Sequence, residues 1–148
     1  MHLYHTDDEP IGFLFQHTNR LIQELRRRLA SLHGLEEAQP RIMGILAHEP
    51  GISQRELSER LAITPASTTA QVQKMEIQGL IERRPDPDDQ RALRLYLTEK
   101  GQEIDRNLVA GLNALEATFL EGLEQKEITE FRRLLLHIHD NCHRALQS

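Results

Sequence analysis

Small and hydrogen-bonding side chains gather between residues 53 and 74. If the segment after residue 64 is a helix, Thr68, Val72 and Met75 form its apolar face, and the opposite face is small or hydrogen-bonding. Small side chains let a helix backbone approach base edges, while hydroxyl, amide and ammonium groups can bond bases or phosphates. An ordinary solvated helix face is the alternative interpretation. The candidate contacts are Ser53, Thr64, Ala66, Ser67, Thr69, Ala70, Gln73 and Lys74.

A second group of charged side chains surrounds a turn between two short apolar runs. Leucines alternate with other residues over 93–97, which is typical of a half-buried strand, and the prolines and aspartates of 85–91 indicate a loop. A guanidinium at the tip of such a loop can enter a narrow, electronegative minor groove. Asp89 is close enough in sequence to pair with Arg91 and fix its direction; a solvated charged turn is the alternative. The group comprises Arg84, Asp89, Arg91 and Arg94.

Local signals predict the helices that must position these groups. Ser53 and Glu56 have the spacing of a capping box, in which each side chain bonds the other residue's backbone N–H. Thr64 is a good N-cap, and Pro65 is tolerated at the first helical position. The short connection between the two helical patterns predicts a helix-turn-helix. Together with the following hairpin, this predicts a winged helix.

The wing sequence resembles that of the MarR family of transcriptional regulators. Three short motifs have the spacing of the family's wing signature. They are Gly-Leu-Ile before the wing, Asp-x-Arg at 89–91 and Leu-Thr-x-x-Gly at 97–101, where the wing ends. The resemblance extends over most of the chain and implies a dimeric, ligand-responsive DNA-binding protein, usually a repressor. Two positions depart from the pattern, since Ala70 replaces a common Arg and Gln71 a common apolar residue. The first change favours A·T-rich half-sites or leaves more of the affinity to the wing.

The apolar stripes that flank this unit are wider than one small winged helix can cover. Residues 10–33 follow a near-heptad register, and two further helical patterns lie beyond residue 98. We expect a mainly α fold with a small β-wing, a winged helix-turn-helix flanked by N- and C-terminal dimerisation helices. The expected parts are an N-terminal arm and dimerisation helix (1–34), the DNA-binding domain (35–98, opening with a helix over 35–48) and C-terminal dimerisation helices (99–148).

A homodimer would set the spacing of two recognition helices. Two-fold symmetry with a separation of about 34 Å requires a pseudo-palindromic double-stranded DNA operator. A ligand that binds one spacing better than another would change the affinity for DNA. The resemblance suggests a small amphipathic or aromatic effector beneath the dimer helices, with a filled core as the equal alternative. The candidate pocket residues are Phe13, His17, Leu21, His33, Ile45 and Leu112.

The overall net charge of −5 argues at first against a nucleic-acid partner. The excess acid lies in the flanks, because residues 1–52 and 101–148 carry net charges of −2 and −3, whereas 53–100 have eight basic and eight acidic side chains. A neutral segment binds DNA only if a few cations converge on one surface while the acids turn away. The cations required to converge are Lys74, Arg83, Arg84, Arg91 and Arg94.

Other function classes find less support in the sequence. No membrane span, signal peptide, phosphate loop or nucleophile–base pair is evident, so we expect a cytoplasmic protein without catalysis or cofactor. Cys142 lies on an apolar stripe, which favours a structural role over redox sensing. His139 and His143 have a spacing that can share a metal, but nothing completes the site, so we expect no metal. The rival function is a winged helix used for protein contacts or assembly without specific DNA binding.

Overall fold

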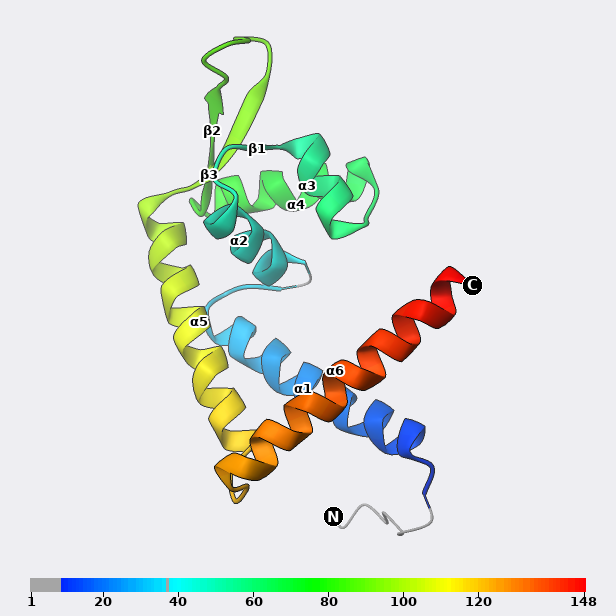
Figure 1. Ribbon diagram of the computed structural model, residues 1–148. Helices are drawn as coiled ribbons and strands as arrows, with labels where there is room; N and C mark the ends of the chain where they lie inside the picture. The colour runs from blue at the N-terminus through cyan, green and yellow to red at the C-terminus, as the bar shows by residue number, and fades with distance from the viewer. Residues whose placement is uncertain (1–8, 37) are drawn as a thin grey trace. The chain divides into compact units, whose positions relative to one another are not determined.

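The computed structural model of the protein describes residues 9–36 and 38–148, so most of the predicted N-terminal arm lies outside the described residues. The chain divides into two compact units, Met1–Leu112 and Asn113–Ser148. The first unit contains the predicted winged helix-turn-helix, which confirms the fold class (Figure 1). The elements in chain order are α1 (Ile11–Leu32), α2 (Gln39–His48), β1 (Ile52–Ser53), α3 (Gln54–Leu61), α4 (Pro65–Ile77), β2 (Ile81–Pro85), β3 (Leu93–Leu97), α5 (Glu99–Phe119) and α6 (Gln125–Gln147).

Both helices of the helix-turn-helix begin at the predicted caps. The Ser53 hydroxyl accepts the Glu56 N–H at 3.2 Å, and the Glu56 carboxylate accepts the Ser53 N–H at 2.8 Å. Thr64 caps α4 by accepting the N–H of Ser67 at 3.1 Å, and Pro65 is the first residue of that helix. These bonds satisfy N–H groups that have no partner within a helix, which fixes where α3 and α4 start.

A buried pair of hydroxyl groups joins α3 to α4. Ser58 Oγ donates to Thr68 Oγ1 at 2.7 Å, and Thr68 Oγ1 donates to the Thr64 carbonyl at 3.2 Å. Thr68, Val72 and Met75 are all buried, as the apolar spacing of α4 predicted. Because a buried hydroxyl without a partner is costly, this pair favours one arrangement of the two helices.

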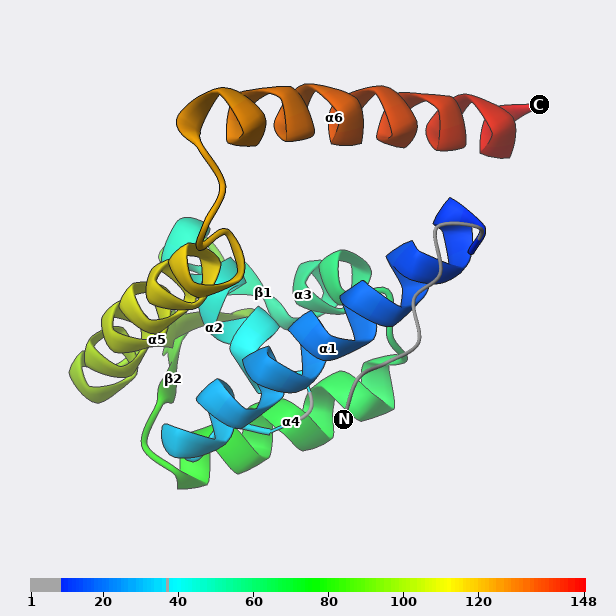
Figure 2. The same ribbon diagram turned by 90° about the horizontal axis from the view of Figure 1, so that it is seen from below.

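The three strands form an antiparallel sheet in the order β1-β3-β2. Ile52 pairs with Leu95, so β1 joins the sheet as the family resemblance implied, and Ile81 pairs with Leu97. We call β2, the loop 86–92 and β3 the wing, which projects beyond α2, α3 and α4 (Figure 1). Seen from below, α2 lies between α5 and α3 (Figure 2). Helix α4, the predicted recognition helix, and the wing therefore belong to one packed unit.

Aliphatic side chains of the first unit form its core. Helix α2 begins at Gln39 and not at Leu35 as predicted, and Ala38 directly before it lies in a turn. Gly34 has a φ of +72°, and the Gln39 side-chain oxygen accepts the Glu36 N–H at 3.1 Å, which stabilises the turn. The fully buried aliphatic side chains include Leu35, Ile42, Met43, Leu46, Leu57, Leu61, Val72, Met75 and Leu95.

Helices α1 and α6 expose large apolar side chains in the single chain. On α1 the side chains of Ile11, Phe13 and Phe15 are exposed, and α6 has no buried residue at all. A water-exposed amphipathic helix with this pattern needs a partner for its apolar face. No described helix combines the length and apolarity that a membrane span requires.

Two glycine substitutions test this packing in opposite directions. We expect Gly101→Ala to lower the free energy of unfolding by at least about 2 kcal/mol, because a Cβ would lie 2.2 Å from the Leu80 carbonyl oxygen. Gly44→Ala in α2 meets nothing within 4 Å, so it should raise that free energy by about 0.5–1 kcal/mol. Urea denaturation measures both. Wild-type stability in Gly101→Ala would contradict the close approach of α5 to Leu80.

Candidate nucleic-acid interface

The outer face of α4 has the character predicted for a base-reading surface. Ala66, Ser67, Ala70 and Gln73 are exposed, and Thr69 is half-buried between α3 and α4. Because Thr68, Val72 and Met75 hold the opposite face in the core, the exposed side chains are presented on a rigid helix. Such a face can approach the major groove closely and offers hydroxyl, amide and methyl contacts.

The hydroxyl groups around this face are already engaged within the protein. Ser53 and Thr64 serve as helix caps, and Ser53 also donates to the Glu56 carboxylate at 2.7 Å. Thr69 accepts from the Gln54 side-chain amide at 2.6 Å and donates to the Pro65 carbonyl at 2.9 Å. Gln54 was missed in the sequence, where nothing but its place at the start of a helix marked it. It ties the first residue of α3 to the recognition helix.

Four of the five expected cations are bound by carboxylates of the same chain. The residues of these pairs lie from 2 to 38 positions apart in the chain, and Lys74 with Glu36 is the most distant pair. These carboxylates therefore partly neutralise the cations that were predicted to contact DNA. They are Lys74 with Glu36, Arg83 with Glu76 (2.8 and 3.1 Å), Arg84 with Glu82, and Arg94 with Asp86 (2.6 Å). Arg84 also stacks over the Tyr96 ring at 4.3 Å from its centroid.

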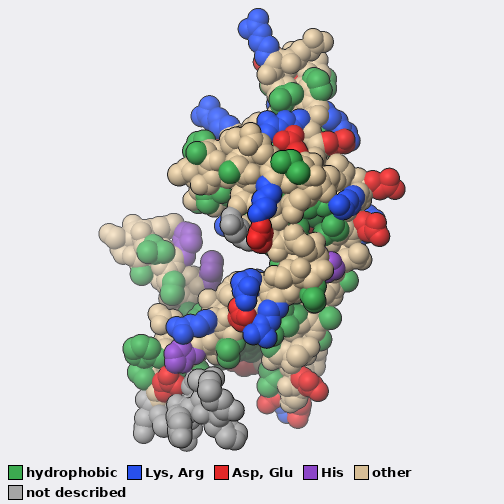
Figure 3. All heavy atoms as spheres, turned by 180° about the vertical axis from the view of Figure 1, so that it is seen from behind, with side chains coloured by type: hydrophobic (Ala, Val, Ile, Leu, Met, Phe, Trp, Pro, Cys, Tyr) green, Lys and Arg blue, Asp and Glu red, His purple; other side chains and the backbone are tan. Residues whose placement is uncertain are grey.

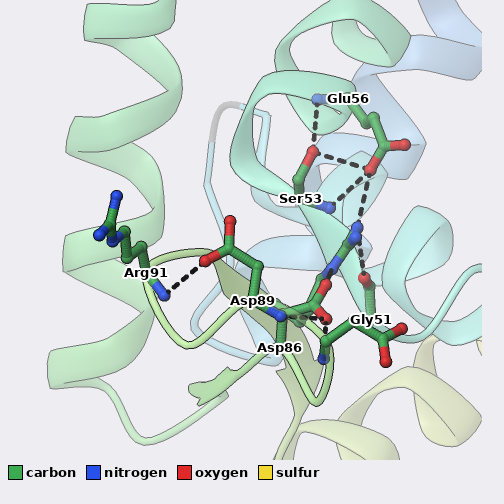
Figure 4. Close-up of polar contacts among 8 residues, drawn as sticks. Gly51, Ser53, Glu56, Asp86, Asp89 and Arg91 are labelled. Carbon is green, nitrogen blue, oxygen red and sulfur yellow. Dashed lines mark hydrogen bonds and ion pairs between the residues drawn. The ribbon is translucent and has the colours of Figure 1, made fainter.

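Arg91 is exposed, and its guanidinium has no hydrogen bond or ion pair with any described residue. The expected pairing of the Asp89 carboxylate with that guanidinium is wrong. Asp89 Oδ1 instead accepts the backbone N–H of Arg91 at 3.0 Å, while the Arg91 side chain extends away from it (Figure 4). Asp89 still orients Arg91, but through the backbone, because an aspartate readily bonds the N–H two residues later.

Charges of both signs crowd the wing end of the molecule. Figure 3 shows basic side chains there with carboxylates beside several of them. Backbone and hydroxyl bonds from Ser53, with further help from Arg94, hold the pKa of Glu56 below its usual range. The N–H of Asp88 and the Arg94 guanidinium likewise lower the pKa of Asp86. Both carboxylates therefore stay charged near neutrality, and the wing end has a mixed surface without a broad basic patch.

The six predicted pocket residues do not all face one space in the single chain. Phe13 and Leu21 are exposed on α1, while His17 and His33 are half-buried. Ile45 and Leu112 pack against the core. Leu112 also lines a cavity of about 450 Å³ together with apolar, basic and polar side chains and the carboxylate of Glu36, which come from α1, α2, α5 and the segment before α2. The principal members of that lining are Arg26, Arg27, Ala30, Leu35, Arg41 and Leu108.

The histidines and the cysteine of α6 form no developed site. The His139 and His143 rings lie 6.1 Å apart between centroids, and His139 is 3.1 Å from Asp140. No group of three or more His, Cys, Asp or Glu within the described ranges is arranged to hold a metal ion. Cys142 is a free, exposed thiol in the single chain.

Comparison with known proteins places this arrangement in a family. A model of the MarR family matches residues 33–92, which include the helix-turn-helix and most of the wing. The HTH-type transcriptional repressor Rv2887 of Mycobacterium tuberculosis is 28% identical over 130 residues, with 87% of this chain and 93% of the relative covered. The transcriptional regulator HosA of Escherichia coli O111:H- is 31% identical over 120 residues, with 81% of this chain and 84% of the relative covered.

Solved structures show the same fold. A MepR variant of S. aureus bound to an oligodeoxyribonucleotide has a TM-score of 0.70, with 91% of this chain and 99% of that chain covered. It is 18% identical to this chain, so the likeness concerns the fold alone. With a family model across the winged helix-turn-helix and a relative 31% identical over most of both sequences, the chain belongs to the MarR family.

Proposed function

We propose that this protein is a sequence-specific, double-stranded-DNA-binding transcriptional repressor of the cytoplasm. The observation that carries the proposal is that one unit presents two surfaces suited to contact DNA. The exposed face of α4 has small and hydrogen-bonding side chains for a major groove, and Arg91 on the wing carries a guanidinium with no partner among the described residues. The relatives named as transcriptional repressor and transcriptional regulator support this function.

The working form that we propose is a homodimer. The exposed apolar faces of α1 and α6 support it, since each would bury its side chains against a second copy. Two-fold symmetry would set the two α4 helices about one turn of DNA apart, roughly 34 Å, over a pseudo-palindromic operator. Residues 1–34 and 99–148 would then supply the dimer contacts, and 35–98 the DNA contacts.

We further propose that a small amphipathic effector modulates DNA binding. The cavity of about 450 Å³ beside Leu112 supports this, because it falls within the size range of small-molecule sites. Leu35, Leu108 and Leu112 are apolar lining residues. Three arginines in the same lining outnumber the one carboxylate, that of Glu36, and they suit an acidic substituent. An effector there would lie against α1, α2 and α5, where it can favour one spacing of the DNA-binding units.

Selection from a pool of random DNA duplexes tests the main proposal. At low salt the wild-type protein should enrich one sequence with two inverted half-sites whose centres lie about 10 base pairs apart. DNA from the promoter region of its own gene is the second probe. Failure to enrich any sequence at low salt would contradict the repressor function. A partner protein bound stoichiometrically without DNA would then favour the assembly module.

A further inference from the structure

The carboxylate of Asp86 lies at the centre of a hydrogen-bond network at the base of the wing. Its side chain is buried, with the residue only 8% exposed. Oδ1 accepts the N–H groups of Asp88 at 2.8 Å and Asp89 at 3.3 Å, and Oδ2 accepts Arg94 Nε at 2.6 Å. Charge-assisted bonds of this kind are about twice as strong as neutral ones, so Asp86 fixes the first half of the loop.

Arg94 connects this loop to the helix-turn-helix. Its guanidinium approaches the Gly51 carbonyl at 3.5 Å and the Glu56 carboxylate at 3.4 Å, in addition to Asp86. Glu56 in turn forms the capping box with Ser53 at the start of α3 (Figure 4). Arg94 therefore bridges the wing loop, the turn before β1 and the first turn of α3.

The same network continues to Arg91. Asp89, whose N–H is held by Asp86, accepts the Arg91 N–H through its side chain at 3.0 Å. Backbone bonds from Asp86 N to Ala92 O and from Ala92 N to Asp89 O, both 2.9 Å, close the loop. The backbone at Arg91 is thus fixed from the inside, although its side chain points outward (Figure 4).

We infer that Asp86 and Arg94 are positioning residues that aim Arg91 at the minor groove, and that Arg94 does not itself contact DNA. This inference rests on the proposed function. It changes the role predicted for Arg94 from its sequence position, because the guanidinium already has three acceptors within the protein. It also gives a role in DNA binding to an acidic residue that would only repel phosphates if it stood alone.

A matched pair of substitutions separates positioning from charge. Asp86→Ala and Asp88→Ala each remove one negative charge from the same loop, but the Asp88 side chain is exposed and bonds no described residue. Loss of an acid alone should strengthen binding to the polyanion. We expect Asp88→Ala to bind the selected duplex at least as tightly as wild type, and Asp86→Ala to bind it about tenfold more weakly. Binding to a scrambled duplex should not fall in either variant.

A double-mutant cycle with Arg91→Ala tests whether the effect passes through Arg91. In the Asp86→Ala background, Arg91→Ala should change affinity by no more than about twofold, since its contribution is already lost. In the Arg94→Leu background, Arg91→Ala should likewise change the affinity by no more than about twofold. Arg94→Leu alone should keep the wild-type dependence of DNA affinity on salt concentration. If Asp86→Ala does not fold, Asp86→Asn and Arg94→Leu take its place in the test of whether the effect passes through Arg91. Asp86→Asn retains an acceptor for the two N–H groups.

Fluorescence anisotropy with the labelled selected duplex gives all of these affinities. Equal affinities for Asp86→Ala and Asp88→Ala would overturn the inference, as would additive losses in the cycle. The slope of the logarithm of the binding constant against the logarithm of the salt concentration would instead fall in magnitude by about one in Arg94→Leu if Arg94 contacts a phosphate. If wild type prefers no sequence, the proposed function fails and this inference with it; if wild type and Arg91→Ala differ while Asp86 has no effect, the inference fails alone.

Discussion

Replacing Arg91 with alanine is expected to weaken binding to the operator by about 1–3 kcal/mol, which is roughly 5- to 150-fold in Kd. The physical reason is that Arg91 is the cation of the wing end whose guanidinium has no carboxylate partner among the described residues. It alone within the predicted set can bind DNA without first giving up an internal ion pair. Anisotropy titrations at two salt concentrations measure the loss.

Arg106→Ala is the matched control for Arg91→Ala. Arg106 is exposed on α5 and lies outside the predicted DNA-binding residues, so its loss removes the same charge from the same unit. Its effect on specific binding should stay below about 0.5 kcal/mol. Equal losses in the two variants would show that net charge, and not a placed guanidinium, determines affinity for the operator.

A charge in the apolar face of α6 is expected to break the dimer and to weaken operator binding by about 100-fold or more. Ile138 is 43% exposed in the single chain, on the stripe that would be buried by a second copy. Ile138→Asp would place a carboxylate in that interface at a cost of several kcal/mol. A monomer would keep only one half-site, and the gain from linking two binding events would disappear.

Sedimentation velocity and anisotropy of the same samples test this expectation together. Asn141→Asp provides the control, because it adds the same charge on α6 at a polar position. It should leave both the mass and the affinity unchanged. A wild-type protein that sediments as a monomer at micromolar concentration, or an Ile138→Asp dimer with normal DNA binding, would contradict the proposed assembly.

Local signals made the helix-turn-helix readable in the sequence. The Ser53–Glu56 box and the Thr64-Pro65 start depend on residues within one turn of each other, and both helices begin where these signals predicted. The buried face of α4 follows from spacing alone in the same way. The start of α2 was harder to predict, because the Gln39 side chain and Gly34 stabilise a turn that apolar spacing does not reveal.

The carboxylate partners of the predicted DNA-binding cations could not be predicted from the sequence. Lys74 and Glu36 are 38 residues apart in the chain, and Arg94 is paired with Asp86 across the wing loop. The equal number of acids and bases between residues 53 and 100 showed that the segment is neutral, but not which charges neutralise each other. Only the tertiary fold brings Glu36 and Asp86 to their partners and leaves Arg91 exposed.

This internal neutralisation has a consequence for how copies of the protein distribute over a genome. Sequence-independent attachment to DNA grows with every cation that faces phosphate, and a genome offers about a million or more such competing sites. Because Arg83, Arg84 and Arg94 are held by carboxylates of their own chain, we expect random DNA to compete poorly for this protein. A small number of copies can then keep an operator occupied, since few of them are sequestered elsewhere on the chromosome.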